Sequence, residues 1–185
     1  KSTIVNNSSN HISLSVLDGL QNLLPSGVTT DLQNSRSNLV DAYKKSELLP
    51  DVGLGVYALS AIIVDKAEPS EALKANTVWS VGVKTPKYLI SSTQLNNFRK
   101  GSTVLQEEDI RAEKGAYFTV SDIALQAGSK ENWMFVANVN QTISGITKIS
   151  ELIKKENNLE ILVQDNIELG TKKLVKLTEA SDGLQ

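Results

Sequence analysis

The sequence of 185 residues contains no cysteine and a single histidine, and both shortages exclude whole classes of chemistry. Without cysteine the chain has no disulfides, no thiol nucleophiles and no Cys-ligated zinc sites. One histidine, His11, cannot build a metal site that needs several. It follows a polar N-terminal stretch, whereas a catalytic base must be held within hydrogen-bond reach of its nucleophile. We therefore interpret His11 as a surface residue.

The chain also lacks an excess of either charge. It has 19 Lys and Arg against 21 Asp and Glu, a net charge of −2. Because phosphate binding needs a concentrated positive field, nucleic acid is not expected as a partner. The basic residues occur mostly in small clusters, which we interpret mainly as solvated faces. A polyanion contact requires folding to gather several of them, and the candidates are Arg99, Lys100, Lys172 and Lys173.

No apolar run is long enough to cross a membrane. The longest, GLGVYALSAIIV at residues 53–64, has twelve positions, whereas a spanning helix needs about 20. It also lacks the third glycine or the lysine of a phosphate-binding loop. Its Val, Ile and Tyr residues favour a buried strand. Gly53 and Gly55 then indicate a turn or bulge where that strand begins.

Helical spacing of apolar residues occurs in three places. After a short strand at 12–16, the leucines from Leu17 to Leu24 predict a helix that Pro25 ends. A second helix is expected from Thr30 or Asp31 to about residue 45, although its middle, QNSRSN, has poor helix propensity. The clearest helix is KISELIKKENN, which begins at residue 148 and pairs a glutamate with a lysine four positions later.

Strands dominate the rest of the chain. A hairpin is predicted from the two strands TVWSVGVK and KYLISS. Further strands are expected at residues 116–120, 133–139, 159–163 and 174–177. We predict a mainly β fold, an antiparallel jelly-roll-like β-sandwich with two or three peripheral helices, with an α+β fold as the alternative. Residues 1–10 are expected to be a flexible segment and residues 11–185 a single globular domain.

Several residues could carry chemistry. Glu107, Glu108, Asp109 and Glu113 could bind Ca²⁺ or act as an acid–base pair, but an exposed acidic turn is the favoured interpretation. Carboxylates at strand ends could pair across a cleft for glycoside hydrolysis, although charged strand ends are also ordinary surface features; these are Asp65, Glu68 and Asp122. The large aromatic residues are expected in the core rather than stacked on sugars; they are Trp79, Tyr88, Tyr117, Phe118 and Trp133.

Three Asn-x-Ser/Thr sequences favour an extracytoplasmic setting, since they would accept glycans on a eukaryotic secretory route. Their acceptors are Asn6, Asn7 and Asn140. The chain opens on Lys1 and its only methionine is Met134, so we expect a processed or excised piece of a longer protein.

The order of segments resembles a known family. VLDGLQNLLPSGVT, AYKKSELLPD and VYALSAIIV resemble the opening of thrombospondin N-terminal-like, laminin-G-like domains, and NTVWSVGV, KYLISS and ENWMFVANVNQ resemble later strands. This resemblance implies a short amphipathic helix ahead of a jelly-roll sandwich, and an extracellular binding or adhesion module. The sequence departs from the family pattern because it lacks cysteine and dense basic clusters. We assign no binding residue from the resemblance.

These observations lead to three hypotheses of function. The first is a secreted or cell-surface binding or adhesion module, a glycoprotein that recognises protein or carbohydrate, including glycosaminoglycan-type partners. The second is a small carboxylate-dependent hydrolase, and the third is a structural subunit of a surface or viral assembly. No catalytic, cofactor-binding or metal-binding residue is assigned, and the enzyme hypothesis is less favoured than the binding-module hypothesis. A large exposed apolar patch would favour the third hypothesis.

Overall fold

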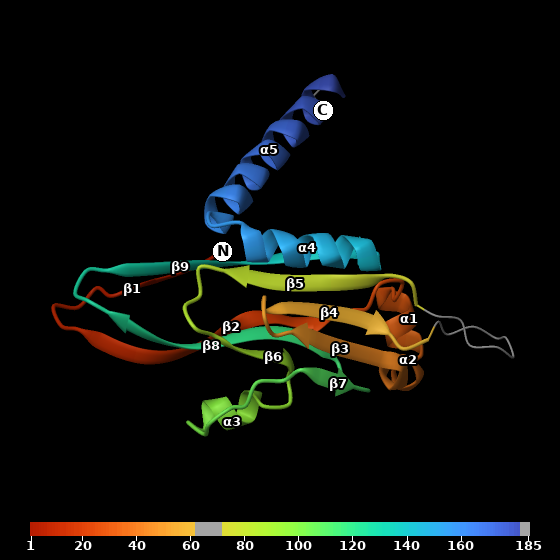
Figure 1. Cartoon of the computed structure of the whole chain (residues 1–185), viewed down its shortest axis with the longest axis horizontal. Coiled ribbons are helices and arrows are strands. Elements are labelled where there is room, and N and C mark those ends of the chain that lie inside the picture. The colour runs from red at the N-terminus through yellow and green to blue at the C-terminus, as the bar shows by residue number, and fades with distance from the viewer. Residues whose placement is uncertain (62–71, 182–185) are drawn as a thin grey trace, which may run out of the picture.

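The computed structural model describes residues 1–61 and 72–181, which form two antiparallel sheets packed as a β-sandwich with peripheral helices (Figure 1). This confirms the predicted fold class. The six-stranded sheet has the order β1 (Ser2–Val5), β9 (Lys130–Gln141), β5 (Ala75–Val81), β4 (Leu54–Leu59), β3 (Lys44–Leu49), β7 (Asp109–Arg111). The three-stranded sheet has the order β2 (Ile12–Leu23), β8 (Gly115–Leu125), β6 (Lys87–Ser91). The helices in the described ranges are α1 (Thr30–Ser35), α2 (Ser37–Tyr43), α3 (Leu95–Arg99), α4 (Ile143–Lys155) and α5 (Leu159–Ala180).

Three apolar layers follow from the alternation of side chains along the strands. On the outer face of the larger sheet, Leu54, Trp79 and Met134 pack under the isoleucines of α4. Between the sheets, Tyr57, Val78 and Tyr117 form a second cluster. On the outer face of the smaller sheet, below which α3 lies in Figure 1, a third cluster gathers Leu89, Val104, Ala116 and Phe118. The aromatic residues expected in the core are accordingly buried, except Tyr88, which is half-buried.

Two tyrosines tie the sheets together by reciprocal hydrogen bonds. The hydroxyl of Tyr57, on β4, donates to the carbonyl of Ala116 on β8 at 2.6 Å. The hydroxyl of Tyr117, on β8, donates to the carbonyl of Gly53 before β4, also at 2.6 Å. The two side chains are 1% and 0% exposed, so each bond is shielded from bulk solvent. Each sheet therefore satisfies backbone carbonyl groups of the other.

Glycines make room for three tyrosine rings, those of Tyr57, Tyr88 and Tyr117. A Cβ on Gly55 would come within 2.7 Å of the Tyr57 hydroxyl oxygen, and one on Gly53 within 2.2 Å of the Tyr88 hydroxyl oxygen. Gly53 also has a φ of +61°, a left-handed conformation that favours glycine. The turn expected from GLGVYA is thus present, and its glycines are required by the tyrosines as much as by the backbone. Residues 62–64 of that run lie outside the described residues.

The helix predicted from Leu17 to Leu24 is wrong, because β2 continues as a strand to Leu23. The leucine spacing arises from a bulge: Asn22 has a φ of +56°, and the register against β8 shifts between Gln21 and Leu23. This shift points Leu23 into the layer between the sheets together with Leu20. The amphipathic helix that the family resemblance implied at this place is absent for the same reason.

Two predicted strands, at 159–163 and 174–177, are also wrong, because both lie within the helix α5. Short apolar runs do not distinguish strand from helix by periodicity alone. The helix predicted from KISELIKKENN is confirmed as α4, and its Glu151–Lys155 ion pair is present at 3.0 Å. The helix expected before Pro50 is confirmed in two pieces, α1 and α2, which separate at Arg36 within QNSRSN.

Two expectations about connectivity need correction. The strands β5 and β6 do not form a hairpin, since β5 pairs with β4 and β9 whereas β6 pairs with β8 in the other sheet. The N-terminal segment expected to be flexible contains β1, whose residues Ser2–Val5 pair with β9. Both features depend on partners distant in sequence, which local composition does not reveal.

Alkaline pH is expected to unfold the protein through its buried phenols. Burial raises the pKa of Tyr57 and of Tyr117 well above its ordinary value, and also raises the pKa of Tyr88. Unfolded, each phenol ionises near pH 10, so stability is retained below about pH 10 and falls above it, by about 1.4 kcal/mol per pH unit for each such group.

Urea unfolding between about pH 8 and pH 11 measures this loss, with phenolate absorbance recorded in parallel. Phenolate from these tyrosines should appear together with loss of the native circular dichroism signal. Ionisation of all four tyrosines near pH 10 in a chain that stays folded would contradict the arrangement.

Candidate functional site

A cleft opens where β6 stops covering β8. The pairing of β6 with β8 ends at Val120, which lies opposite Lys87. The strand β8 continues to Leu125, where it is paired only with β2. The connection from β5 to β6 passes this uncovered part of β8, at the left of Figure 1. The space between them has a volume of about 350 Å³, which is within the range of small-molecule sites. Its lining residues are Val16, Gly82, Val83, Lys84, Thr85, Thr119, Ser121, Asp122, Ile123, Ala124, Glu131 and Trp133.

The connection that forms one wall has an unusual backbone. Thr85 has a φ of +43°, a left-handed conformation that is unfavourable for a β-branched residue. Gly82 has a φ of +90°, and a Cβ there would come within 2.6 Å of the Asn132 carbonyl oxygen. The Ser121 hydroxyl donates to the carbonyl of Lys84 at 2.7 Å and so ties this wall to β8. Strained residues persist where surrounding contacts hold them, and they concentrate at functional sites.

The inner wall is held by hydrogen bonds to a half-buried carboxylate, that of Asp18. Trp133 is 6% exposed, and its indole nitrogen donates to Asp18 on β2 at 2.7 Å. The other oxygen of Asp18 accepts the backbone N–H of Gly19 at 2.8 Å, and the Ser2 hydroxyl also donates to this carboxylate. The indole is therefore fixed between the two sheets. Asp18 has no distinctive sequence context, and sequence reasoning missed it.

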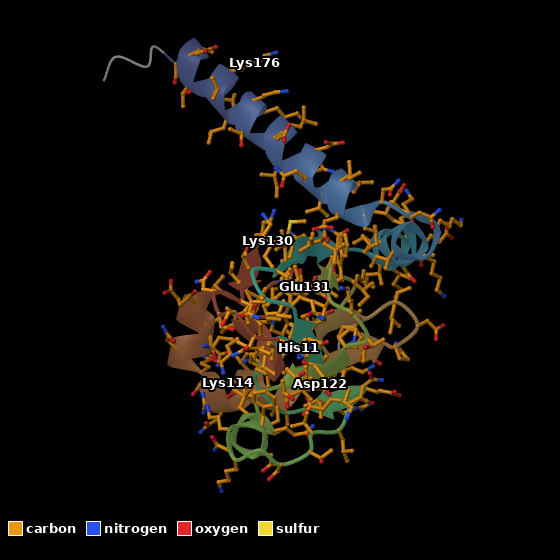
Figure 2. All side chains as sticks on the ribbon, turned by 90° about the vertical axis from the view of Figure 1, so that its left-hand side faces the viewer. His11, Lys114, Asp122, Lys130, Glu131 and Lys176 are labelled. Atoms are coloured by element: carbon orange, nitrogen blue, oxygen red, sulfur yellow. The ribbon has the colours of Figure 1, made fainter. Side chains whose placement is uncertain are left out.

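The rim carries both charges. Lys84 and Glu131 form an exposed ion pair at 2.7 Å, and Asp122 accepts a hydrogen bond from the Ser15 hydroxyl. Figure 2 views this end of the sandwich and labels both acidic residues. One lysine against two carboxylates gives the rim a net charge of −1. An anionic ligand is therefore not favoured here, whereas the hydroxyl groups of a neutral sugar would find both donors and acceptors.

The acidic cluster predicted at 107–113 is divided by the fold. Glu107 is 6% exposed, and its Oε2 atom accepts the N–H groups of Ile90 and Ser91, each at 2.8 Å. Its Oε1 atom accepts the Ser91 hydroxyl at 3.1 Å, and also the Thr93 hydroxyl at 3.1 Å and the Gln94 amide at 2.8 Å. Five donors occupy this carboxylate, so it anchors the chain after α3 to β6. It is thus not part of an exposed acidic turn.

The other members of the cluster, Glu108, Asp109 and Glu113, are exposed as expected. Within the described ranges, no three His, Asp or Glu side chains gather in a way that could hold a metal ion. Of the carboxylates proposed at strand ends, Asp122 lies in the cleft, whereas Asp65 and Glu68 lie outside the described residues. His11 is exposed.

The four candidate polyanion contacts are not brought together. Arg99 and Lys100 lie at the end of α3, whereas Lys172 and Lys173 lie on α5, and these helices are at opposite ends of the molecule (Figure 1). The basic pair of Lys44 and Lys45 is only partly solvated. Lys44 is 4% exposed, and its Nζ atom forms an ion pair with Oδ1 of Asp41 at 2.7 Å. Burial alone would raise the pKa of Asp41, but hydrogen bonds from Lys44 and Gln33 outweigh it and lower that pKa.

The three glycan acceptors differ in environment. Asn6 is 2% exposed, and its side-chain nitrogen donates to the carbonyls of Asn10, Leu125 and Gln126 at 2.8–3.1 Å. A glycan on that nitrogen would replace a hydrogen that these bonds use. Asn7 and Asn140 are exposed, and they are the two acceptors whose position in the folded chain suits modification.

Replacing Glu107 with glutamine is expected to lower the free energy of unfolding by about 2 to 3 kcal/mol, because the amide sets a donor against donors in a buried site. Glu108→Gln, one position away and exposed, is the matched control and should change it by less than about 0.5 kcal/mol. Denaturant unfolding of both variants measures the difference. Equal effects would show that the five hydrogen bonds do not anchor this loop.

Comparison with known proteins does not assign the chain to a family. No protein-family model matches the chain, and no curated protein matches it at a significant level. The resemblance to thrombospondin N-terminal-like domains therefore stays a hypothesis. None of the described helices combines the length and apolarity needed to span a bilayer.

Proposed function

We propose that this chain is a non-catalytic, extracytoplasmic binding module whose cleft takes a short, uncharged carbohydrate. The observation that carries the proposal is the cleft itself. Its volume of about 350 Å³ suits one or two sugar rings, since small-molecule sites begin near this size. The exposed sequons at Asn7 and Asn140 support the extracytoplasmic setting.

The chemistry of the lining supports a sugar over other small ligands. Hydroxyl groups of Thr85, Thr119 and Ser121 line the cleft together with the Asp122 carboxylate, and an apolar surface of valine, isoleucine and tryptophan lies between them. Sugars present hydroxyl groups around an apolar ring face, so they need both kinds of surface. The net acidic rim disfavours a glycosaminoglycan in this cleft.

The arrangement supports binding rather than hydrolysis. Glycoside hydrolysis needs one carboxyl that protonates the leaving group and a second that acts as base or nucleophile. In the cleft, Glu131 is engaged by Lys84 and Asp122 by the Ser15 hydroxyl. Neither carboxylate stands in the unpaired, apolar environment that keeps a catalytic acid protonated.

A glycan array followed by calorimetry on the best ligand tests this proposal. Asp122→Asn should weaken binding about tenfold or more, because a hydrogen bond to a charged group contributes about 1.5 to 3 kcal/mol. Ala124→Trp, at an exposed lining position, should abolish binding by filling the cleft. The control is Asp31→Asn in α1, at the opposite end of the sandwich in Figure 1.

Three results would overturn the proposal. They are no glycan bound on the array, a bound glycan whose affinity is unchanged in both cleft variants, and turnover of the glycan to shorter products. Retention on heparin at low salt that depends on Arg99 and Lys100 would move the binding surface to α3 and replace the cleft.

A second candidate function, the structural subunit of a surface assembly, is favoured by a different observation. The helix α5 exposes several large apolar side chains, among them Ile167, Leu174 and Leu177 at 50%, 62% and 68%. Exposed apolar patches of this kind mark interaction sites.

A further inference from the structure

The cleft occupies the position that a longer β6 would fill. The strand β6 begins at Lys87, which lies opposite Val120 of β8. The chain just before it does not follow the strand path, because Thr85 has a left-handed φ of +43°. Between them, Pro86 has no N–H group to donate to a neighbouring strand. The end of β8 is therefore left without a neighbour on this side.

The hydrogen bonds of β6 identify which backbone groups this break leaves open. The carbonyl of Tyr88 accepts the N–H of Glu107 at 3.0 Å, so the backbone groups of Tyr88 point away from β8. Because these groups alternate along an antiparallel strand, those of Leu89 point toward β8, where Phe118 is opposite. By the same alternation, the residues of β8 whose backbone groups point to this side are Phe118, Val120, Asp122 and Ala124.

Asp122 and Ala124 thus present backbone groups to the cleft that they line. Within residues 1–61 and 72–181, no hydrogen bond joins the N–H or carbonyl of either residue to another group. Figure 2 labels Asp122 at this end of the sandwich. An unpaired strand edge is a template for peptide-like groups, since each residue offers one donor and one acceptor. A ligand that pairs with this edge needs an amide.

The length of the open edge favours a small ligand over an added peptide strand. A peptide can extend a sheet by pairing with a free edge, but strands typically have about five or six residues. Here the edge is closed on one side, where the Ser121 hydroxyl donates to the Lys84 carbonyl at 2.7 Å. On the other side β8 ends at Leu125. The open edge therefore suits an isolated amide group.

Among neutral sugars, an N-acetylated sugar carries such a group. Its acetamido group is planar and trans, so its N–H and carbonyl point in opposite directions. One of them can bond to β8 while the other points across the cleft toward the connection at residues 82–85. The methyl group is apolar, and Val83 and Ile123 of the lining offer apolar contacts. The acetamido group is also uncharged, which suits the net acidic rim.

We propose that the sugar taken by this cleft is an N-acetylated hexosamine, whose acetamido carbonyl accepts the N–H of Ala124 at the open edge of β8. Ala124 is preferred to Asp122 because it lies farther from the hydrogen bond of Ser121 that closes the edge, by about 10 Å along the strand at about 3.4 Å per residue. The inference rests on the proposed function, since it names the class of sugar for the same cleft.

Matched pairs of sugars test the inference on the unmodified chain. The disaccharides N,N′-diacetylchitobiose and cellobiose share their linkage and ring configuration, and differ in carrying an acetamido group or a hydroxyl at carbon 2 of each ring. N-acetylgalactosamine and galactose extend the comparison to the other configuration at carbon 4. In calorimetry, the acetylated member of at least one pair should bind about tenfold more tightly, the effect of one added hydrogen bond with its methyl contact.

Ala124→Pro removes the proposed donor. Because this N–H faces the cleft and not β2, proline should be tolerated here, as at other strand edges. The preference for the acetylated sugar should fall to less than about threefold, whereas Ala124→Ser, which retains the N–H, is the matched control and should keep the preference. In the unmodified chain, the Ala124 amide proton should shift in nuclear magnetic resonance spectra on titration with the acetylated sugar and not with its partner.

The outcomes separate this inference from the proposed function. Equal affinity within both pairs, with binding weakened by Asp122→Asn, would overturn the inference and leave the carbohydrate proposal standing. A preference that survives in Ala124→Pro, without a shift of the Ala124 amide proton, would overturn the assigned donor. Absence of binding to any sugar would overturn both proposals. If acetyl-tetraalanine amide shifts that proton and no sugar does, the cleft takes a peptide strand instead.

Discussion

The reciprocal hydrogen bonds of Tyr57 and Tyr117 are the constraint on which the rest of the structure depends. Each hydroxyl crosses the apolar layer between the sheets and ends on a backbone carbonyl of the other sheet. A buried carbonyl without a partner is costly, so the sheets cannot slide or separate without leaving such groups unpaired. Gly55 leaves the space that these two rings fill, and Gly53 leaves the space for the neighbouring ring of Tyr88.

The candidate site inherits its geometry from this arrangement. The strand β8 carries the buried Tyr117 near its start, and a few residues later its Ser121 and Asp122 line the cleft. Asp18 and Trp133 hold the two sheets together at the same end through a partly buried hydrogen bond. The cleft is thus a feature of how the two sheets meet. By contrast, α5 has few contacts with the sandwich beyond its first turns, which suits an element that pairs with another molecule.

Sequence reasoning succeeded where the signal is local. The alternation around Trp79, the apolar strand near Tyr117 and the face of α4 each follow from side chains within a few residues of one another. It failed at β2 and α5, because a bulge at Asn22 imitates helical spacing and short apolar runs suit either structure. The burial of Glu107, and not of Glu108, could not be predicted from the sequence. The five groups that donate hydrogen bonds to Glu107 lie on β6 and on the turn that follows β6. Of the cleft residues, Asp122 was named as a possible site residue and Trp133 was expected in the core. The others were missed because pairing between strands distant in sequence assembles them.

The most direct test of the central claim is the free energy of unfolding of Tyr57→Phe, Tyr117→Phe and the double variant. Tyr43→Phe serves as the control, since the Tyr43 hydroxyl makes no hydrogen bond within the described part of the chain. Each single variant should lose about 1 to 3 kcal/mol, because a buried carbonyl is left without its donor, and the two losses should not be additive, since the rings share one cluster. If both variants unfold within about 0.5 kcal/mol of the parent, as the control should, the tyrosine hydroxyls do not hold the two sheets together.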